Sequence, residues 1–302
     1  MLRYVSVWLL VCFTGLFLSQ AWCDSFDWRA YSGTGYLGVA GNLPPGNYVP
    51  PVQNQGNVDT CWAFAALESL EANYAISCRN PSYMPNLSVQ NLVCAGNQGY
   101  FLNGDISNIY GGAEDVATNY FLTTGITTVN KIPYNQTNSS PYWPLQAPYT
   151  LYKATEMKWT WDLYADPASI KTYLKTYGPI EAEIVAGTDF IDPATGLKYP
   201  NGLGNGYHSV LIVGYADSAL AGLGGGYYTV ENSSGDTWGP TGNGFGYVSY
   251  ATMQSDNYLT AISGTSYAVT VPVPVPNTFF LLSALVLSVG IKVFFTKRIP
   301  VI

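Results

Sequence analysis

One cysteine at the start of an apolar, helix-patterned segment, and one histidine far downstream, most constrain what this chain can fold into. Cys61 is followed by Trp62, Ala65 and Leu70 at helical spacing. His208 is the only histidine among 302 residues and lies about 147 positions later. A thiol nucleophile is activated by a neighbouring base. Cys61 and His208 are therefore candidates for a thiolate nucleophile and its base, which requires a fold that brings a helix N-terminus close to a distant segment.

The two halves of the chain differ in hydrophobic period. Helical spacing covers residues 61–75, 88–93 and 114–123, with Thr60 or Asp59 as the first cap and Gly125 as a terminator. Residues 135–150 predict a crossing linker. Strand patterns follow at residues 179–186, 209–215, 227–232 and 246–250. We expect an α+β fold with a helical lobe over about 51–135 and a β lobe over about 150–270.

Residues 1–23 predict a secretory signal peptide. Arg3 supplies the positive charge, residues 7–18 are mostly apolar, and Ala21 and Cys23 are the small residues of a cleavage site. We expect cleavage after Cys23 and export of the main domain, residues 24–270. An uncleaved signal anchor is the alternative, and bulky Trp22 disfavours a lipoprotein cysteine.

The C-terminal segment predicts a membrane anchor. Alternating Val and Pro make residues 271–277 a linker that is neither helix nor central strand. Residues 278–295 are apolar over about the minimum length of a membrane helix. The basic tail, residues 296–302, places this end in the cytoplasm by the positive-inside rule. A buried core helix is the alternative for residues 278–295.

The region between these ends is acidic. It contains all 19 Asp and Glu residues and 8 of the 12 Lys and Arg residues, which gives a net charge near −11. This charge disfavours a nucleic-acid partner.

Cys61, Cys78 and Cys94 remain after the signal peptide. In an oxidising compartment three cysteines suggest one disulfide and one free thiol. Cys78 and Cys94 are the natural pair, which leaves Cys61 reactive.

Several segments together resemble the papain-like cysteine peptidases. In chain order they are a nucleophile block (residues 51–56 with Cys61-Trp62-Ala63-Phe64), a second helix (87–93), a glycine pair (Gly111-Gly112), a histidine strand (208–215) and an asparagine block (Asn232-Ser233, Gly235, Trp238-Gly239). The resemblance runs from about residue 27 to residue 250. All blocks occur in the family's order, which makes the signal far more specific than any one of them.

The resemblance implies a two-lobe fold, with a cleft between a helical lobe and a β-barrel-like lobe. It also implies hydrolysis of protein or peptide substrates without a metal or cofactor. Cys61 would be the nucleophile, His208 the base, and Asn232 the residue that orients the imidazole. The side chain of Gln55 and the backbone N–H of Cys61 would stabilise the oxyanion. On the substrate side, the resemblance points to Gly111 and Gly112, whose backbone would pair with an extended substrate, and to Trp238 on the leaving-group side of the cleft. A simple turn is the alternative for the two glycines, and a core position is the alternative for Trp238. Tyr207 and Asp59, the latter a departure from the family, are further candidates for substrate binding.

The sequence departs from the family at three positions near this site. Val58 and Asp59 stand where the family usually has cysteine and glycine. If the loop borders the substrate's P1 side chain, Asp59 favours Lys or Arg there. Ser234 stands where the family has an aromatic residue that shields the His–Asn hydrogen bond. We expect a wetter hydrogen bond and a weaker ion pair.

The chain ends carry further expectations. Few residues separate the predicted cleavage point from Asp27, near which the family's mature domain usually begins, so we expect no inhibitory propeptide. The tail resembles a PEP-CTERM-type sorting signal, with valine where that motif has glutamate, and this implies an exosortase-type processing enzyme. A plain membrane anchor is the alternative.

Three other functions are alternatives. The first is a catalytically weak or inactive papain-fold binding protein at the cell surface. The second is a peptidoglycan amidase of the other cysteine-hydrolase type, which the single histidine and the upstream glutamine disfavour. A structural anchor protein is the third and ranks last.

Overall fold

A computed structural model describes residues 23–96, 114–136, 145, 147–160, 166–185, 190–199, 207–253, 258–262 and 266–271. The predicted signal peptide (except Cys23), linker, membrane helix and basic tail lie outside these residues, apart from Val271. Within the described segments, no helix has the length and apolar character needed to cross a bilayer.

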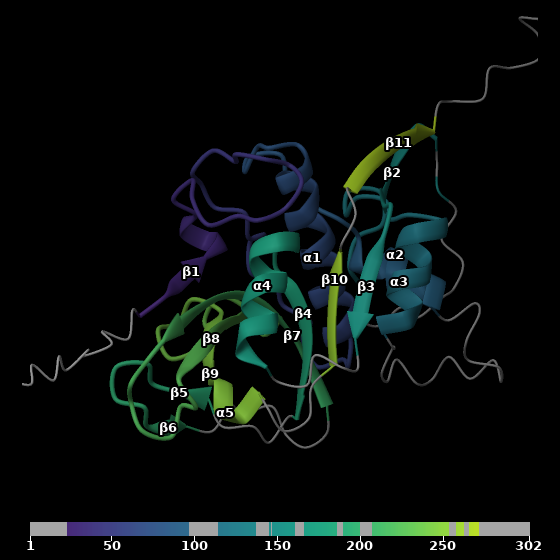
Figure 1. Ribbon diagram of the computed structural model, residues 1–302. Coiled ribbons are helices and arrows are strands. Elements are labelled where there is room, and N and C mark those ends of the chain that lie inside the picture. The colour runs from purple at the N-terminus through teal and green to yellow at the C-terminus, as the bar shows by residue number, and fades with distance from the viewer. Residues whose placement is uncertain are drawn as a thin grey trace, which may run out of the picture.

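An open antiparallel sheet forms one half of the molecule (Figure 1). Its strand order is β3-β10-β4-β7-β8-β9, and β1 pairs with the far end of β7. The strands are β1 (Ser25–Asp27), β3 (Met157–Thr160), β4 (Ile180–Val185), β7 (Tyr207–Asp217), β8 (Gly226–Glu231), β9 (Phe245–Ser249) and β10 (Tyr258–Ile262). In the described strands, β3 and β9 end the sheet without pairing to each other, so the expected β-barrel-like closure is not formed.

Three helices form the other half, and all three correspond to predicted helical patterns. They are α1 (Cys61–Ser77), α2 (Val89–Gly96) and α3 (Glu114–Thr123). Gly125 follows α3 with a φ of 86°, as its predicted role of terminator requires. Beside these helices (Figure 1), β2 (Tyr149–Ala154) pairs with β11 (Ser266–Val271).

Helix α4 (Pro167–Tyr177) is an element that the hydrophobic pattern did not predict. Asp166 caps its first turn by accepting hydrogen bonds from the N–H groups of Ala168 and Ser169. Its Ile170 and Leu174 are buried in the core beside the sheet. The remaining short elements are η1 (Trp28–Ala30), β5 (Phe190–Ile191), β6 (Lys198–Tyr199) and α5 (Tyr250–Met253).

Helix α1 connects two hydrophobic cores. Its first three turns, from Trp62 to Leu70, pack with α2 and α3 in one core. Ala75 and Ile76, near its end, belong to the other core with the sheet, α4 and the N-terminal segment. Figure 1 shows α1 between the sheet and the two smaller helices. Helix α1 contacts β7 and β4 directly, and the N–H of Ser209 on β7 faces Cys61, the first residue of α1, so the start of the helix lies against the strand that contains His208.

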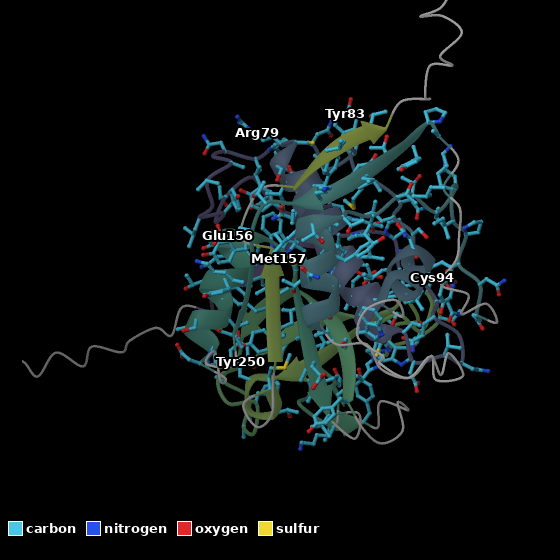
Figure 2. The ribbon with its side chains drawn as sticks, turned by 90° about the vertical axis from the view of Figure 1, so that its right-hand side faces the viewer. Arg79, Tyr83, Cys94, Glu156, Met157 and Tyr250 are labelled. Atoms are coloured by element: carbon cyan, nitrogen blue, oxygen red, sulfur yellow. The ribbon has the colours of Figure 1, made fainter. Side chains whose placement is uncertain are left out.

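The predicted Cys78–Cys94 disulfide is not formed. Both residues are free thiols. Cys78 follows the end of α1, whose last residues pack in the sheet-side core. Cys94 is buried in α2, whose Leu92 and Val93 pack in the helical core. In Figure 2, Arg79, next to Cys78, lies far from Cys94. The two sulfurs are therefore separated by the arrangement of the cores.

Four buried carboxyl groups lie where α1 meets the sheet. Glu68 and Glu71 are on α1, Glu181 is on β4 and Glu231 is on β8, and each is at most 2% exposed. Leu211 pairs with both Glu181 and Glu231, so these two lie in one row across the sheet. Burial raises the pKa of Glu68 to about 8 and holds that of Glu231 well above its usual range. The cluster is therefore most compatible with the folded state when protonated.

We predict that Glu68 makes stability depend on pH. The pKa of Glu68 is higher in the folded state than in the unfolded state. The contribution of protonated Glu68 to the free energy of unfolding is therefore complete below about pH 4.5 and is lost as the pH rises through about 8. Glu68→Gln should flatten the fall in melting temperature across that range. Glu156→Gln, at an exposed position, should keep the wild-type slope. A wild-type slope in Glu68→Gln would contradict the prediction.

Candidate active site

Cys61 is the first residue of α1, as predicted. Helix N-termini leave backbone N–H groups without helical partners, which creates partial positive charge there. Thr60 is the N-cap, but its hydroxyl makes no capping hydrogen bond and instead lies 2.8 Å from the hydroxyl of Tyr134. Burial raises the pKa of the Cys61 thiol, and the N–H groups of Ser209 and Trp62, which face the sulfur, oppose this rise. Since Ser209 follows His208, the fold brings the predicted nucleophile and base into one region.

His208 and Asn232 form a short buried hydrogen bond. Nε2 of the ring lies 2.7 Å from Oδ1 of Asn232. Because an amide oxygen only accepts, the ring nitrogen is the donor. His208 is 7% exposed and Asn232 1%. The two side chains are therefore in contact, and the ring-orienting role of Asn232 stays a prediction.

The amide of Asn232 has a second partner. Its Nδ2 donates to the Ser234 hydroxyl over 2.9 Å. The sequence had suggested that a serine here leaves the His–Asn bond exposed to water, but both residues of that bond are buried. The hydroxyl role of Ser234 was not predicted, because it depends on the turn geometry after β8.

Gln55 is joined to the asparagine segment by a short stretch of backbone pairing. Its N–H donates to the carbonyl of Ser233 over 2.8 Å, and the N–H of Gly235 donates to the carbonyl of Gln53 over 3.0 Å. The hydroxyl of Ser233 also donates to Oε1 of Gln55. The segment of Gln55, the predicted oxyanion donor, and the segment of Asn232, the predicted ring-orienting residue, therefore hold each other in place.

The side-chain amide nitrogen of Gln55 already makes one hydrogen bond within the protein. Nε2 donates to the carbonyl of Val58 over 2.8 Å, which uses one of its two N–H bonds. Tyr134 supports the same loop, since its hydroxyl donates to the carbonyl of Gln55 over 2.9 Å. Sequence reasoning missed Tyr134, because no local pattern links it to a partner 79 residues away.

Burial works against charge at both reacting groups. Desolvation raises the pKa of the Cys61 thiol, although the nearby N–H groups oppose this effect. Desolvation also lowers the pKa of His208, while the Asn232 hydrogen bond and Asp59 raise it. Each group by itself thus favours its neutral form. A thiolate–imidazolium pair requires the two opposite charges to stabilise each other.

The structure places the predicted substrate-binding residues in different surroundings. Asp59 is exposed and acts electrostatically on both Cys61 and His208, so it lies at the site. Tyr207 begins β7 and is 70% exposed. The ring of Trp238 packs edge-on against Phe190, with centroids 5.2 Å apart. Gly111 and Gly112 lie outside the described residues.

A cavity of about 650 Å³ lies elsewhere. It is lined by Tyr215 near the other end of β7, about 23 Å along the strand from His208 at the usual rise per residue. Arg29 and Asp27 in its wall form an ion pair of 2.6 Å. Across the described segments, no cluster of three or more His, Cys, Asp or Glu side chains is arranged to bind a metal ion.

Comparisons with known proteins show the family to which the chain belongs. The model of the papain family cysteine proteases matches residues 24–267. A cathepsin L-like peptidase of Aedes aegypti is 32% identical over 224 residues, which cover 72% of this chain and 60% of that protein. Procathepsin L of Felis catus is 29% identical over 235 residues, which cover 73% of this chain and 62% of that protein. The chain thus spans about three fifths of the length of these curated relatives.

Solved structures support the predicted papain-like fold. The digestive procathepsin L2 proteinase from the larval midgut of Tenebrio molitor superposes with a TM-score of 0.53. The match covers 80% of this chain and 67% of that one, at 23% identity. At this identity the likeness concerns the fold alone. The family model, however, covers most of the sequence, and the chain therefore belongs to the papain family of cysteine proteases.

Proposed function

We propose that this protein is a thiol peptidase in which Cys61, His208, Asn232 and Gln55 carry the reaction. The observation that carries the proposal is the buried 2.7 Å hydrogen bond between His208 and Asn232. It leaves Nδ1 of the imidazole as the nitrogen available to the thiol of Cys61, at the start of α1. Family membership supports peptide-bond hydrolysis as the chemistry.

In the proposed reaction, the thiol proton moves to Nδ1 of His208, and the Cys61 sulfur attacks the substrate's carbonyl carbon. The carbonyl electrons move onto oxygen, where the free N–H of Gln55 and the backbone N–H of Cys61 stabilise the negative charge. As the C–N bond breaks, the imidazolium gives its proton to the leaving amine. Water, deprotonated by His208, then cleaves the thioester and regenerates the thiol.

Asn232 has an orienting role in this proposal. A neutral imidazole donates from one nitrogen and accepts at the other. Because Oδ1 of Asn232 accepts from Nε2, the neutral ring keeps the Nδ1 lone pair for the thiol proton. When the ring is protonated, the same oxygen remains a suitable acceptor. The hydrogen bond therefore serves both protonation states.

The second candidate function is a papain-fold binding protein with weak or no catalysis. Membership of a family of cysteine proteases does not favour this alternative, although burial opposes the charged forms of Cys61 and His208. The two functions differ in whether the Cys61 sulfur becomes a nucleophile near neutral pH.

We predict peptide hydrolysis by purified residues 24–270 that depends on Cys61. Digestion of a peptide library, read by mass spectrometry, should yield cleavage products with the wild type and none with Cys61→Ala. Gln55→Ala should lower kcat by about 10²–10³, as loss of an oxyanion donor does in other acyl transfer sites. Cys78→Ala, which removes an exposed thiol remote from the site, is the matched control and should retain full activity. Equal digestion by wild type and Cys61→Ala would contradict the proposal, and no digestion by either would favour the binding protein.

We further propose that Asp59 favours a basic residue at P1. Its exposed carboxylate, two residues before Cys61, attracts Lys or Arg and repels acidic side chains. Matched peptides should be cleaved faster with P1 Arg than with P1 Glu, by roughly three- to fivefold for one exposed charge pair. Asp59→Asn should reduce that ratio. A ratio of one in the wild type, or one unchanged in Asp59→Asn, would refute this specificity.

Export and anchoring belong to the proposal and rest on the sequence alone, because residues 1–22 and 278–295 lie outside the described structure. We propose secretion through the signal peptide, anchoring by the C-terminal helix, and processing of the tail by an exosortase-type enzyme. Full-length protein should fractionate with membranes, and a chain ending at residue 270 should not. Equal fractionation of the two chains would contradict the anchor.

A further inference from the structure

Ser234 holds the end of the Asn232 amide that faces away from the imidazole. Nδ2 of Asn232 donates to Oγ of Ser234 over 2.9 Å, while Oδ1 lies 2.7 Å from Nε2 of His208. Asn232 is 1% exposed, so water offers little substitute for either partner. The three side chains form a chain from hydroxyl to amide to imidazole.

The position of this hydroxyl is fixed by backbone contacts. Ser234 pairs with Asn54 in an isolated antiparallel bridge. On either side of it, Gln55 donates to the carbonyl of Ser233, and Gly235 donates to the carbonyl of Gln53. Residues 53–55, which include Gln55, therefore fix the position of Ser234, and Ser234 in turn binds the Asn232 amide.

The protonated imidazole makes this arrangement necessary. Both nitrogens of a protonated histidine are donors, so the amide must turn its oxygen toward the ring. Its NH₂ group then points away and needs an acceptor in a buried environment. Oγ of Ser234 supplies that acceptor, which the apolar face of an aromatic ring at this position would not.

We propose that Ser234 is a positioning residue for the reaction: its hydroxyl fixes the Asn232 amide so that Oδ1 faces His208. This inference rests on the proposed function for its catalytic consequence. It replaces the sequence-based expectation that serine at this position weakens the site by admitting water.

The consequence can be observed at His208 itself. The Asn232 hydrogen bond raises the pKa of the imidazole, and burial lowers it. The other titratable groups nearby are Asp59, which also raises this pKa, and the Cys61 thiol. Two further carboxyl groups lie on β4: Glu183, which pairs with Ser209, and Glu181, which acts electrostatically on the Cys61 thiol. Substituting Ser234 leaves those groups in place. A looser Asn232 amide should therefore lower the pKa of His208.

Because His208 is the only histidine, its titration can be followed without interference in an untagged protein. Ring NMR signals of the wild type, Ser234→Ala, Ser234→Thr and the exposed-site control Ser82→Ala should be recorded against pH. We expect Ser234→Ala to lower the His208 pKa by about half a unit or more, as loss of support for a hydrogen bond to the charged form predicts. Ser234→Thr, which keeps the hydroxyl, and Ser82→Ala should match the wild type.

Kinetics supply the second measurement. Ser234→Ala should lower kcat about five- to tenfold, the usual effect of one lost hydrogen bond, with little change in KM. The alkaline limb of kcat/KM should move to lower pH, and Ser234→Thr should restore both. If Ser234→Ala does not fold, as judged by circular dichroism, Ser234→Cys, a weaker acceptor, replaces it.

The outcomes separate the two proposals. An unchanged His208 titration in Ser234→Ala, or a Ser234→Thr variant as impaired as Ser234→Ala, overturns the role of Ser234. A wild type that hydrolyses no peptide overturns the proposed function, while the NMR titration still decides whether Ser234 orients the amide.

Discussion

The backbone pairing between residues 53–55 and 233–235 is the contact on which the candidate site depends. The first segment leads into the helix that begins with Cys61, and the second follows the strand that ends before Asn232. Without this pairing, Gln55 and Asn232 would each be fixed only by its own half of the molecule. Because Ser233 and Ser234 also bind the two side-chain amides, one short junction sets both orientations. The site is therefore a product of the interface between the halves.

The same interface also buries several ionisable groups. Packing α1 against the sheet buries Glu68, Glu71, Glu181 and Glu231 and also desolvates Cys61. Burial favours neutral carboxyls, a neutral thiol and a neutral imidazole. A reactive thiolate in such a place depends on its counter-charge and on oriented N–H groups, because water contributes little. This dependence is why the orientation of His208 matters more here than in a solvated site.

Local sequence patterns predicted the helices better than they predicted the contacts between distant residues. Helical spacing located α1 and α3 closely, and Gly125 ended α3 as expected. Helix α4 was missed although Asp166, Pro167 and Gly178 are ordinary start and stop signals. The barrel and the Cys78–Cys94 disulfide were wrong because sheet closure and core assignment depend on contacts between distant segments. The same limit applied to Tyr134 and Ser234, whose hydrogen bonds arise only from the folded turns.

In the proposed reaction, Cys61 becomes a thiolate only through His208. The most direct test of this dependence is the alkylation rate of Cys61 by iodoacetamide against pH, followed by mass spectrometry of its peptide so that Cys78 does not interfere. The wild type should react rapidly across a plateau near neutral pH. His208→Ala should react only at a pH above the ordinary thiol pKa of about 8.5, because burial raises the thiol pKa and only the N–H groups of Ser209 and Trp62 then oppose it. Superimposable profiles for the two proteins would contradict the account.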